Sequence, residues 1–193
     1  MEIKDQLGIV ARVISEICAP WILNGVFFLI LGGTSEAWLP GIVAVLGTSL
    51  LPMLLIIGLM KMGKVGNHHV TARSQRAVVF AGIIVCVVVL IAVLSALPAP
   101  EIIWAGVFSA LVFLVLFALV TTKIKASVHV GLWVCLVLFL GIGVSAWFFI
   151  GLFFTPVTAW ARVQIRHHSL PEIYAGVVSG AVATLLSFVL FLN

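Results

Sequence analysis

Long apolar runs constrain the fold of this 193-residue chain more than any other feature. The clearest run, residues 77–97, consists mostly of Val, Ile, Leu and Ala and carries no charged residue. A helix of about 20 such residues is long enough to cross the apolar core of a bilayer. Charged residues make up only 8% of the chain, whereas soluble domains carry roughly 25%. The sequence therefore predicts an all-α, multi-pass transmembrane helical bundle.

Polar segments and prolines divide the rest of the chain into further spans. Residues 1–12 mix charged and apolar side chains, which indicates an interfacial amphipathic helix that leads into the first span. The apolar stretch 129–160 is too long for one helix and predicts two short helices that turn near residues 141–145. The other predicted spans are residues 13–31, 38–60, 77–97, 102–122 and 173–193. We expect about six to seven crossings in a single domain over residues 1–193.

The charged residues predict how the bundle is oriented. Even numbers of spans separate loops 61–76, 123–129 and 161–172, so these loops share one side with the N-terminus. All ten Lys and Arg residues lie on that side, whereas the opposite loops carry only Glu36 and Glu101. The positive-inside rule therefore predicts that the basic side faces the cytoplasm. Membrane topology also explains the net charge of +4, so the charge does not indicate a nucleic-acid partner.

The three loops on the basic side carry the chemically active side chains. In loop 161–172, Arg162, His168 and Glu172 follow one another with five and then three residues between them. Loop 123–129 ends in Ser127-Val-His129, and the first loop places Arg73 and Arg76 just before a span. Ionisable residues beside a membrane are costly and are usually functional. The pattern therefore indicates a functional site at this end of the bundle.

These patterns resemble the signatures of the type 2 phosphatidic acid phosphatase (PAP2) superfamily. Arg-x5-His-x3-Glu resembles its last signature and Ser-x-His its second, and residues 66–76 resemble a divergent form of its first. The resemblance covers about residues 60–180, within a phosphatase-like core at about 60–193. The chain departs from the family pattern at five positions: Ala161 stands where Ser is usual, Glu172 where Asp is usual, Ala126 where Pro is usual, Val128 where Gly is usual, and Arg166 where Gly is frequent. No Arg-Pro pair follows a Lys at the expected spacing in the first loop.

The resemblance implies a membrane-embedded hydrolase of lipid phosphates or isoprenyl diphosphates that needs no metal or other cofactor. It also implies a site on the external face, whereas the charge count argues for the cytoplasmic face. An amphiphilic substrate suits a polar site that abuts the bilayer. The choice between phosphatidate-like and polyprenyl diphosphate substrates stays open, as does the oligomeric state.

The residue types fit phosphoryl transfer, which needs neutralised oxygens and a nucleophile placed in line. Guanidinium groups of Arg162 and of a first-loop arginine, Arg76 or Arg73, would hold the phosphate oxygens, and Ser127 would donate a further hydrogen bond. The predicted nucleophile is His168, which would form a phosphohistidine. Glu172 would fix its tautomer, and His129 would protonate the leaving oxygen.

Two other functions remain open. Six residues could gather as metal ligands, which would give a transporter or a metal-dependent hydrolase: His68, His69, His129, His167, His168 and Glu172. No His-x-x-x-His or His-Glu-x-x-His spacing supports that interpretation. The departures from the family pattern favour a catalytically silent lipid-binding protein of the same fold. Simpler roles also exist, since Ser127 could be a helix N-cap and Ser169 with Glu172 a capping box.

Overall fold

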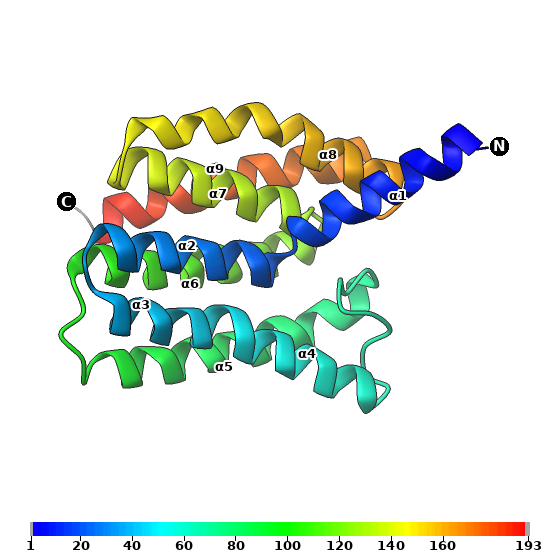
Figure 1. Cartoon of the computed structure of the whole chain (residues 1–193). Coiled ribbons are helices and arrows are strands. Elements are labelled where there is room, and N and C mark those ends of the chain that lie inside the picture. Colours follow the sequence, from blue (N-terminus) through cyan, green and yellow to red (C-terminus); the bar gives the residue numbers. More distant parts are fainter. Residues whose placement is uncertain (1, 192–193) are drawn as a thin grey trace.

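The computed structural model describes residues 2–191, and all secondary-structure elements in this range are helices. Its α-helices are α1 (Glu2–Ile17), α2 (Pro20–Thr34), α3 (Trp38–Val45), α4 (Leu51–Lys61), α5 (Arg76–Leu94), α6 (Glu101–Thr121), α7 (Val128–Gly143), α8 (Thr155–Gln164) and α9 (Leu170–Phe191). A π-helical segment, Leu46–Leu50, joins α3 to α4, and a 3-10 helix, Ala146–Phe154, leads into α8. The helices from α2 to α9 form an elongated bundle (Figure 1).

Five continuous helical segments are long and apolar enough to cross a membrane: Trp38–Lys61, Arg73–Leu94, Glu101–Thr121, Ala146–Gln164 and Leu170–Phe191. A bent pair, Asp5–Ile17 with Pro20–Thr34, supplies a sixth candidate. The predicted all-α architecture is therefore confirmed for the described residues, and the five or six helices that could cross a membrane compare with the six to seven crossings that the sequence predicted. The predicted turn near residues 141–145 also lies where α7 ends and the next helix begins.

The first predicted span needs correction. Residues 13–31 do not form one straight helix, because the chain bends by 46° between Ile17 and Pro20. Proline lacks the N–H that an uninterrupted helix would require, so a new helix begins there. The amphipathic segment instead continues through α1 to Ile17, and Ala11 and Ser15 are buried on it. Helix α1 packs against α8 at one end of the bundle (Figure 1).

Close packing of α7 against α9 places two of the predicted motifs side by side. A Cβ atom on Gly180 would lie 2.1 Å from the Gly131 carbonyl oxygen, and one on Gly176 would lie 2.7 Å from the Ser127 carbonyl oxygen. Glycine at these positions therefore permits backbone contact between the two helices. Where they meet, the Ser127 N–H donates to the Glu172 carbonyl at 3.0 Å. The start of α7 is thereby fixed against the start of α9.

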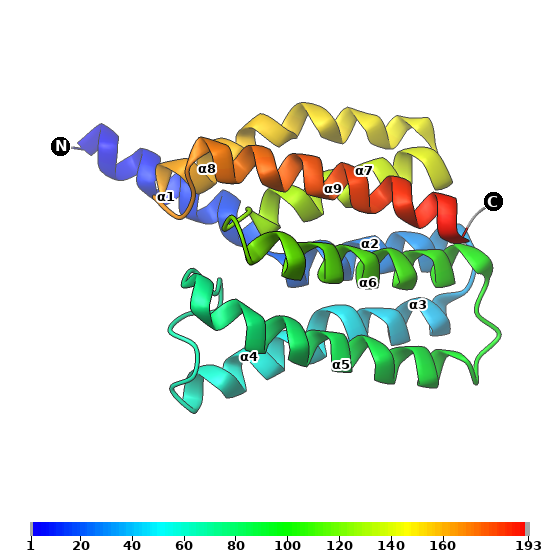
Figure 2. The same ribbon diagram turned by 180° about the vertical axis from the view of Figure 1, so that it is seen from behind.

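The three basic loops lie at one end of the bundle, as predicted. The connections from α4 to α5, from α6 to α7 and from α8 to α9 lie together with the N-terminal helix, and both views show this arrangement (Figures 1 and 2). The connections that carry Glu36 and Glu101 lie at the other end, near the C-terminus. A hydrogen bond from Arg76 Nη1 to the Ala126 carbonyl, at 2.8 Å, joins the first basic loop to the second.

Candidate active site

His168 and Glu172 form a bonded pair at the start of α9. The Nδ1 atom of His168 lies 3.1 Å from Oε2 of Glu172, and the imidazole is buried. The same carboxylate oxygen accepts the Ser169 backbone N–H at 3.1 Å. Glu172 therefore makes both bonds that the sequence suggested, one to the imidazole and one that satisfies a free N–H at the helix start. With Nδ1 directed at the carboxylate, Nε2 is the ring nitrogen left for chemistry.

Arg162 is held inside the bundle at the end of α8. It is only 1% exposed, and Nη1 donates to the hydroxyl of Ser15 on α1. Its Nε has no hydrogen-bond partner among residues 2–191. Its carbonyl accepts the backbone N–H groups of His167 and His168, at 3.1 and 3.2 Å. This tight turn, in which Arg166 adopts a positive φ of 56°, sets His168 at a fixed distance from Arg162.

The two arginines of the first loop have different surroundings. Arg76 is buried, and it donates from Nε to the Val70 carbonyl at 3.2 Å as well as to Ala126. Arg73 is exposed and donates from Nε and Nη2 to the carbonyls of Thr121 and Thr122, which are free acceptors at the end of α6. Arg76 therefore lies among the predicted site residues, whereas Arg73 anchors the end of a helix.

Ser127 and His129 are buried at the start of α7. Ser127 occupies the N-cap position of α7, but its side chain makes no capping hydrogen bond. The suggested capping role of Ser127 is therefore wrong for its side chain. Within the described part of the chain, Ser127 Oγ and His129 Nε2 both lack a hydrogen-bond partner. His129 also interacts electrostatically with Arg162 and His168. Two buried polar atoms near the start of α7 thus lack a partner among the described residues.

His69 is the residue whose position the sequence did not predict. Its ring centroid lies 5.0 Å from that of His129 and 5.7 Å from that of His167. Its Nε2 lies 2.9 Å from Oε1 of Glu16 on α1. The sequence offered His69 only as one of six possible metal ligands and offered no signal for Glu16, because α1 reaches this site through its packing on α8 and not through any motif.

His69, His167 and His168 favour their neutral forms. Burial lowers the pKa of His168 well below its ordinary value, and the positive charges of Arg162 and Arg76 add to that effect. Burial also lowers the pKa of His69 to about 4, with further contributions from His68 and Arg162. The pKa of His167 is lowered in the same way, by burial first and then by Arg162. A neutral imidazole keeps a lone pair, which nucleophilic attack and metal ligation both require.

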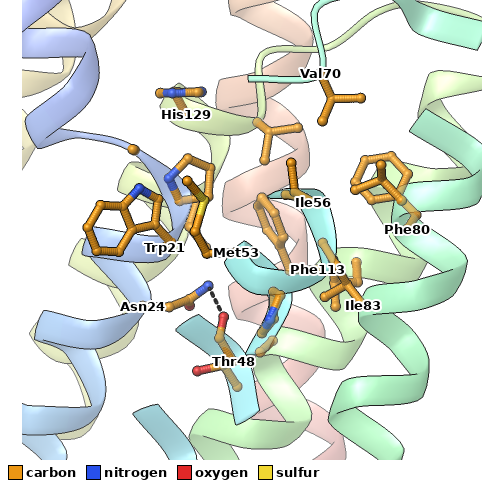
Figure 3. A pocket seen from close by; sticks show the side chains of 18 of the residues that line it. Trp21, Asn24, Thr48, Met53, Ile56, Val70, Phe80, Ile83, Phe113 and His129 are labelled. Atoms are coloured by element: carbon orange, nitrogen blue, oxygen red, sulfur yellow. Dashed lines mark hydrogen bonds between the residues drawn. The ribbon is translucent and has the colours of Figure 1, made fainter. Parts of the chain in front are cut away.

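Two cavities meet at His69. One is an apolar cavity of about 110 Å³ between α2, α4, α5, α6 and α7, lined by residues such as Trp21, Met53, Phe80 and Phe113 (Figure 3). His69, Arg76 and His129 also line it. The other cavity is polar, and its lining includes Arg12, Glu16, His69, Arg166 and His167. Arg162, Ser127 and His168 line neither of these two cavities.

The described residues thus form a helical protein with five or six helices long and apolar enough to span a membrane, and with a buried, basic, histidine-rich cluster at one end. Comparisons of the chain with family models, with curated proteins and with solved structures gave no significant match. Membership of the PAP2 superfamily therefore stays a prediction that rests on the three motifs and their placement.

Proposed function

We propose that this protein is a phosphatase embedded in the membrane that hydrolyses a lipid phosphate or an isoprenyl diphosphate through a phosphohistidine. One observation carries the proposal. Among the described residues, polar atoms of Ser127, His129 and Arg162 are buried without a hydrogen-bond partner. The Ser127 backbone N–H bonds to the Glu172 carbonyl, and His129 and Arg162 interact electrostatically with His168. Buried donors are almost always satisfied in proteins. An anionic group with several oxygens is the ligand that these donors would satisfy together.

In the proposed reaction, His129 carries an extra proton when the anionic substrate is bound. Nε2 of His168 attacks phosphorus and the bond from phosphorus to the lipid oxygen breaks. The His129 imidazolium gives that oxygen its proton and becomes neutral, so the lipid leaves as a neutral alcohol, or as a monophosphate if the substrate is a diphosphate. Water then attacks the phosphohistidine and passes a proton to His129, which releases phosphate and restores both rings. Glu172 holds the Nδ1 proton and stabilises the positive charge that forms on the His168 ring.

The cavities support an amphiphilic substrate. An apolar chain suits the cavity lined by Trp21, Met53 and Phe113, whereas a charged headgroup suits the polar cavity with Arg12 and Arg166. His69 lines both cavities, so it would lie beside a substrate whose chain and headgroup occupy them. Charge pairing with the basic residues would orient the headgroup, and the burial of the chain would supply most of the affinity.

Phosphate release from purified protein tests the proposal. The protein would be assayed in mixed micelles with dioleoyl phosphatidate, farnesyl diphosphate and a soluble phosphate ester, each in EDTA. We expect turnover of at least one lipid substrate, little turnover of the soluble ester, and loss of turnover in Glu172→Gln, which cannot stabilise the imidazolium. A folded protein without turnover of any lipid would favour the silent lipid-binding alternative.

A further inference from the structure

The side chains of Glu16, His68 and His69 converge on one point, and Glu16 and His69 also line the polar cavity. Nε2 of His69 lies 2.9 Å and Nε2 of His68 lies 3.2 Å from the same carboxylate oxygen, Oε1 of Glu16. The two imidazole rings are 4.0 Å apart at their centroids. One ligand atom from each of the three residues lies within 4.8 Å of the others. Two imidazoles and one carboxylate on one centre form a common ligand set for zinc.

These separations match the dimensions of a metal site. Zinc bonds to nitrogen and oxygen are about 2.0–2.1 Å long, so the atoms of a tetrahedral site are separated by about 3.3 Å. The two measured separations are close to that edge, and small rotations of the rings would admit the ion. Each imidazole would then carry its proton on Nδ1 and present the Nε2 lone pair to the metal.

The exposure of the three side chains would let an ion bind from solvent. The Glu16 side chain is 51% exposed and that of His68 is 34% exposed, whereas that of His69 is 9% exposed. The ion would therefore enter from the solvent side and rest against a buried ligand. Since Arg12 and Arg166 line the same polar cavity, we expect weaker binding than at a buried structural zinc site.

We propose that Glu16, His68 and His69 form a binding site for a divalent transition metal, with zinc as the expected ion and a fourth position open to water. None of these three residues is the proposed nucleophile, His168, or a proposed phosphate-binding arginine, Arg76 or Arg162. It joins α1 to the loop before α5, and the Val70 carbonyl of that loop accepts the Nε–H of Arg76. The bound metal therefore stabilises the loop that positions Arg76.

The test uses full-length protein in detergent, purified without a histidine tag and stripped with EDTA. After incubation with zinc and desalting, metal analysis should find one zinc per chain, and cobalt should give the visible absorption of a tetrahedral site. Glu16→Gln and His68→Ala should each weaken zinc binding at least tenfold, while the matched control Glu101→Gln, at the opposite end, should bind as the parent does. Zinc should also raise the Tm of the parent but not that of Glu16→Gln.

The same samples separate this proposal from the proposed function. His168→Ala should keep its zinc while it loses phosphatase turnover, so failure of one activity leaves the other measurable. A parent protein that retains no zinc, or that retains as much as folded Glu16→Gln, would show that the cluster is only a set of hydrogen bonds between α1 and the loop. Unchanged elution on size exclusion would confirm that each variant is folded.

Discussion

Replacing Arg162 with lysine tests whether the guanidinium, and not only its charge, is needed. Arginine offers five N–H donors in a planar fork, whereas lysine offers three donors from one atom. In the structure, Nη1 is committed to Ser15, and Nε has no partner among the described residues. A lysine at this position can keep the charge and one hydrogen bond, but it cannot place a second donor at the position of Nε.

The expected loss of activity follows from the one hydrogen-bond donor that lysine lacks at the position of Nε. Removing one preorganised donor from a buried site costs on the order of 100-fold in rate, or about 2.7 kcal/mol of transition-state stabilisation. We therefore expect Arg162→Lys to lower kcat/KM roughly 100-fold. Most of the loss should fall on kcat, because the clamp acts most strongly on the charge that develops in the transition state.

The assay is phosphate release from the best lipid substrate, with Arg73→Lys as the matched control. Arg73 carries the same charge on the same side but donates to the end of α6, so its lysine variant should lower the Tm while turnover stays within a few-fold of the parent. If folded Arg162→Lys turns over at nearly the parent rate, Arg162 is not a two-donor clamp. If both variants lose turnover equally, the loss reflects a shared structural effect and the assignment of Arg162 fails.

Three further predictions concern the nucleophile, the response to pH and the orientation. His168→Ala should abolish turnover while His167→Ala keeps much of it, and labelled phosphate trapped on His167 would overturn the assignment. The pKa of His69 is lowered from 6.5 to about 4. The His69 side chain therefore makes its full contribution to the free energy of unfolding above pH 6.5. That contribution is lost as the pH falls to about 4, because below pH 6.5 the unfolded chain binds the proton that the folded chain excludes. The free energy of unfolding in detergent should fall by about 1.4 kcal/mol per pH unit from this group, about 3 kcal/mol in all. His69→Gln should reduce the slope by that amount, while the contributions of His167 and His168 remain. Single cysteines at positions 34 and 71, replacing threonines in a chain without its three native cysteines, test orientation in intact cells. A membrane-impermeant thiol reagent should label position 34 only, and labelling of position 71 alone would place the site outside.

The sequence predicted the spans well because each span is set by local composition. The run 77–97 and the turn near 141–145 could be found from apolar length and from the need to break a 32-residue stretch. The bond between His168 and Glu172 could also be predicted, because residues four apart lie on one face of a helix start. The gathering of the three basic loops at one end follows from the number of spans between them.

The sequence could not predict contacts that depend on how distant helices pack. Ser15 and Glu16 reach the site because the chain bends between α1 and Pro20 and α1 packs against α8. No residue spacing in the sequence indicates that contact. His69 lies between two cavities for the same reason. The sequence favoured Arg76 over Arg73 only because Arg76 lies directly at the start of the span, and the structure adds that the two residues differ in burial and in hydrogen-bond acceptors.

The burial of Arg76 and Arg162 is the strongest physical argument that the site is shaped for an anion. Moving a charged group out of water costs several kcal/mol unless it is paired. Across residues 2–191, neither guanidinium forms a salt bridge with a carboxylate. Carbonyl groups satisfy part of Arg76, and the hydroxyl of Ser15 satisfies part of Arg162. A phosphate would supply the missing negative charge, and because burial excludes competing water, each hydrogen bond to it would be stronger than at the surface.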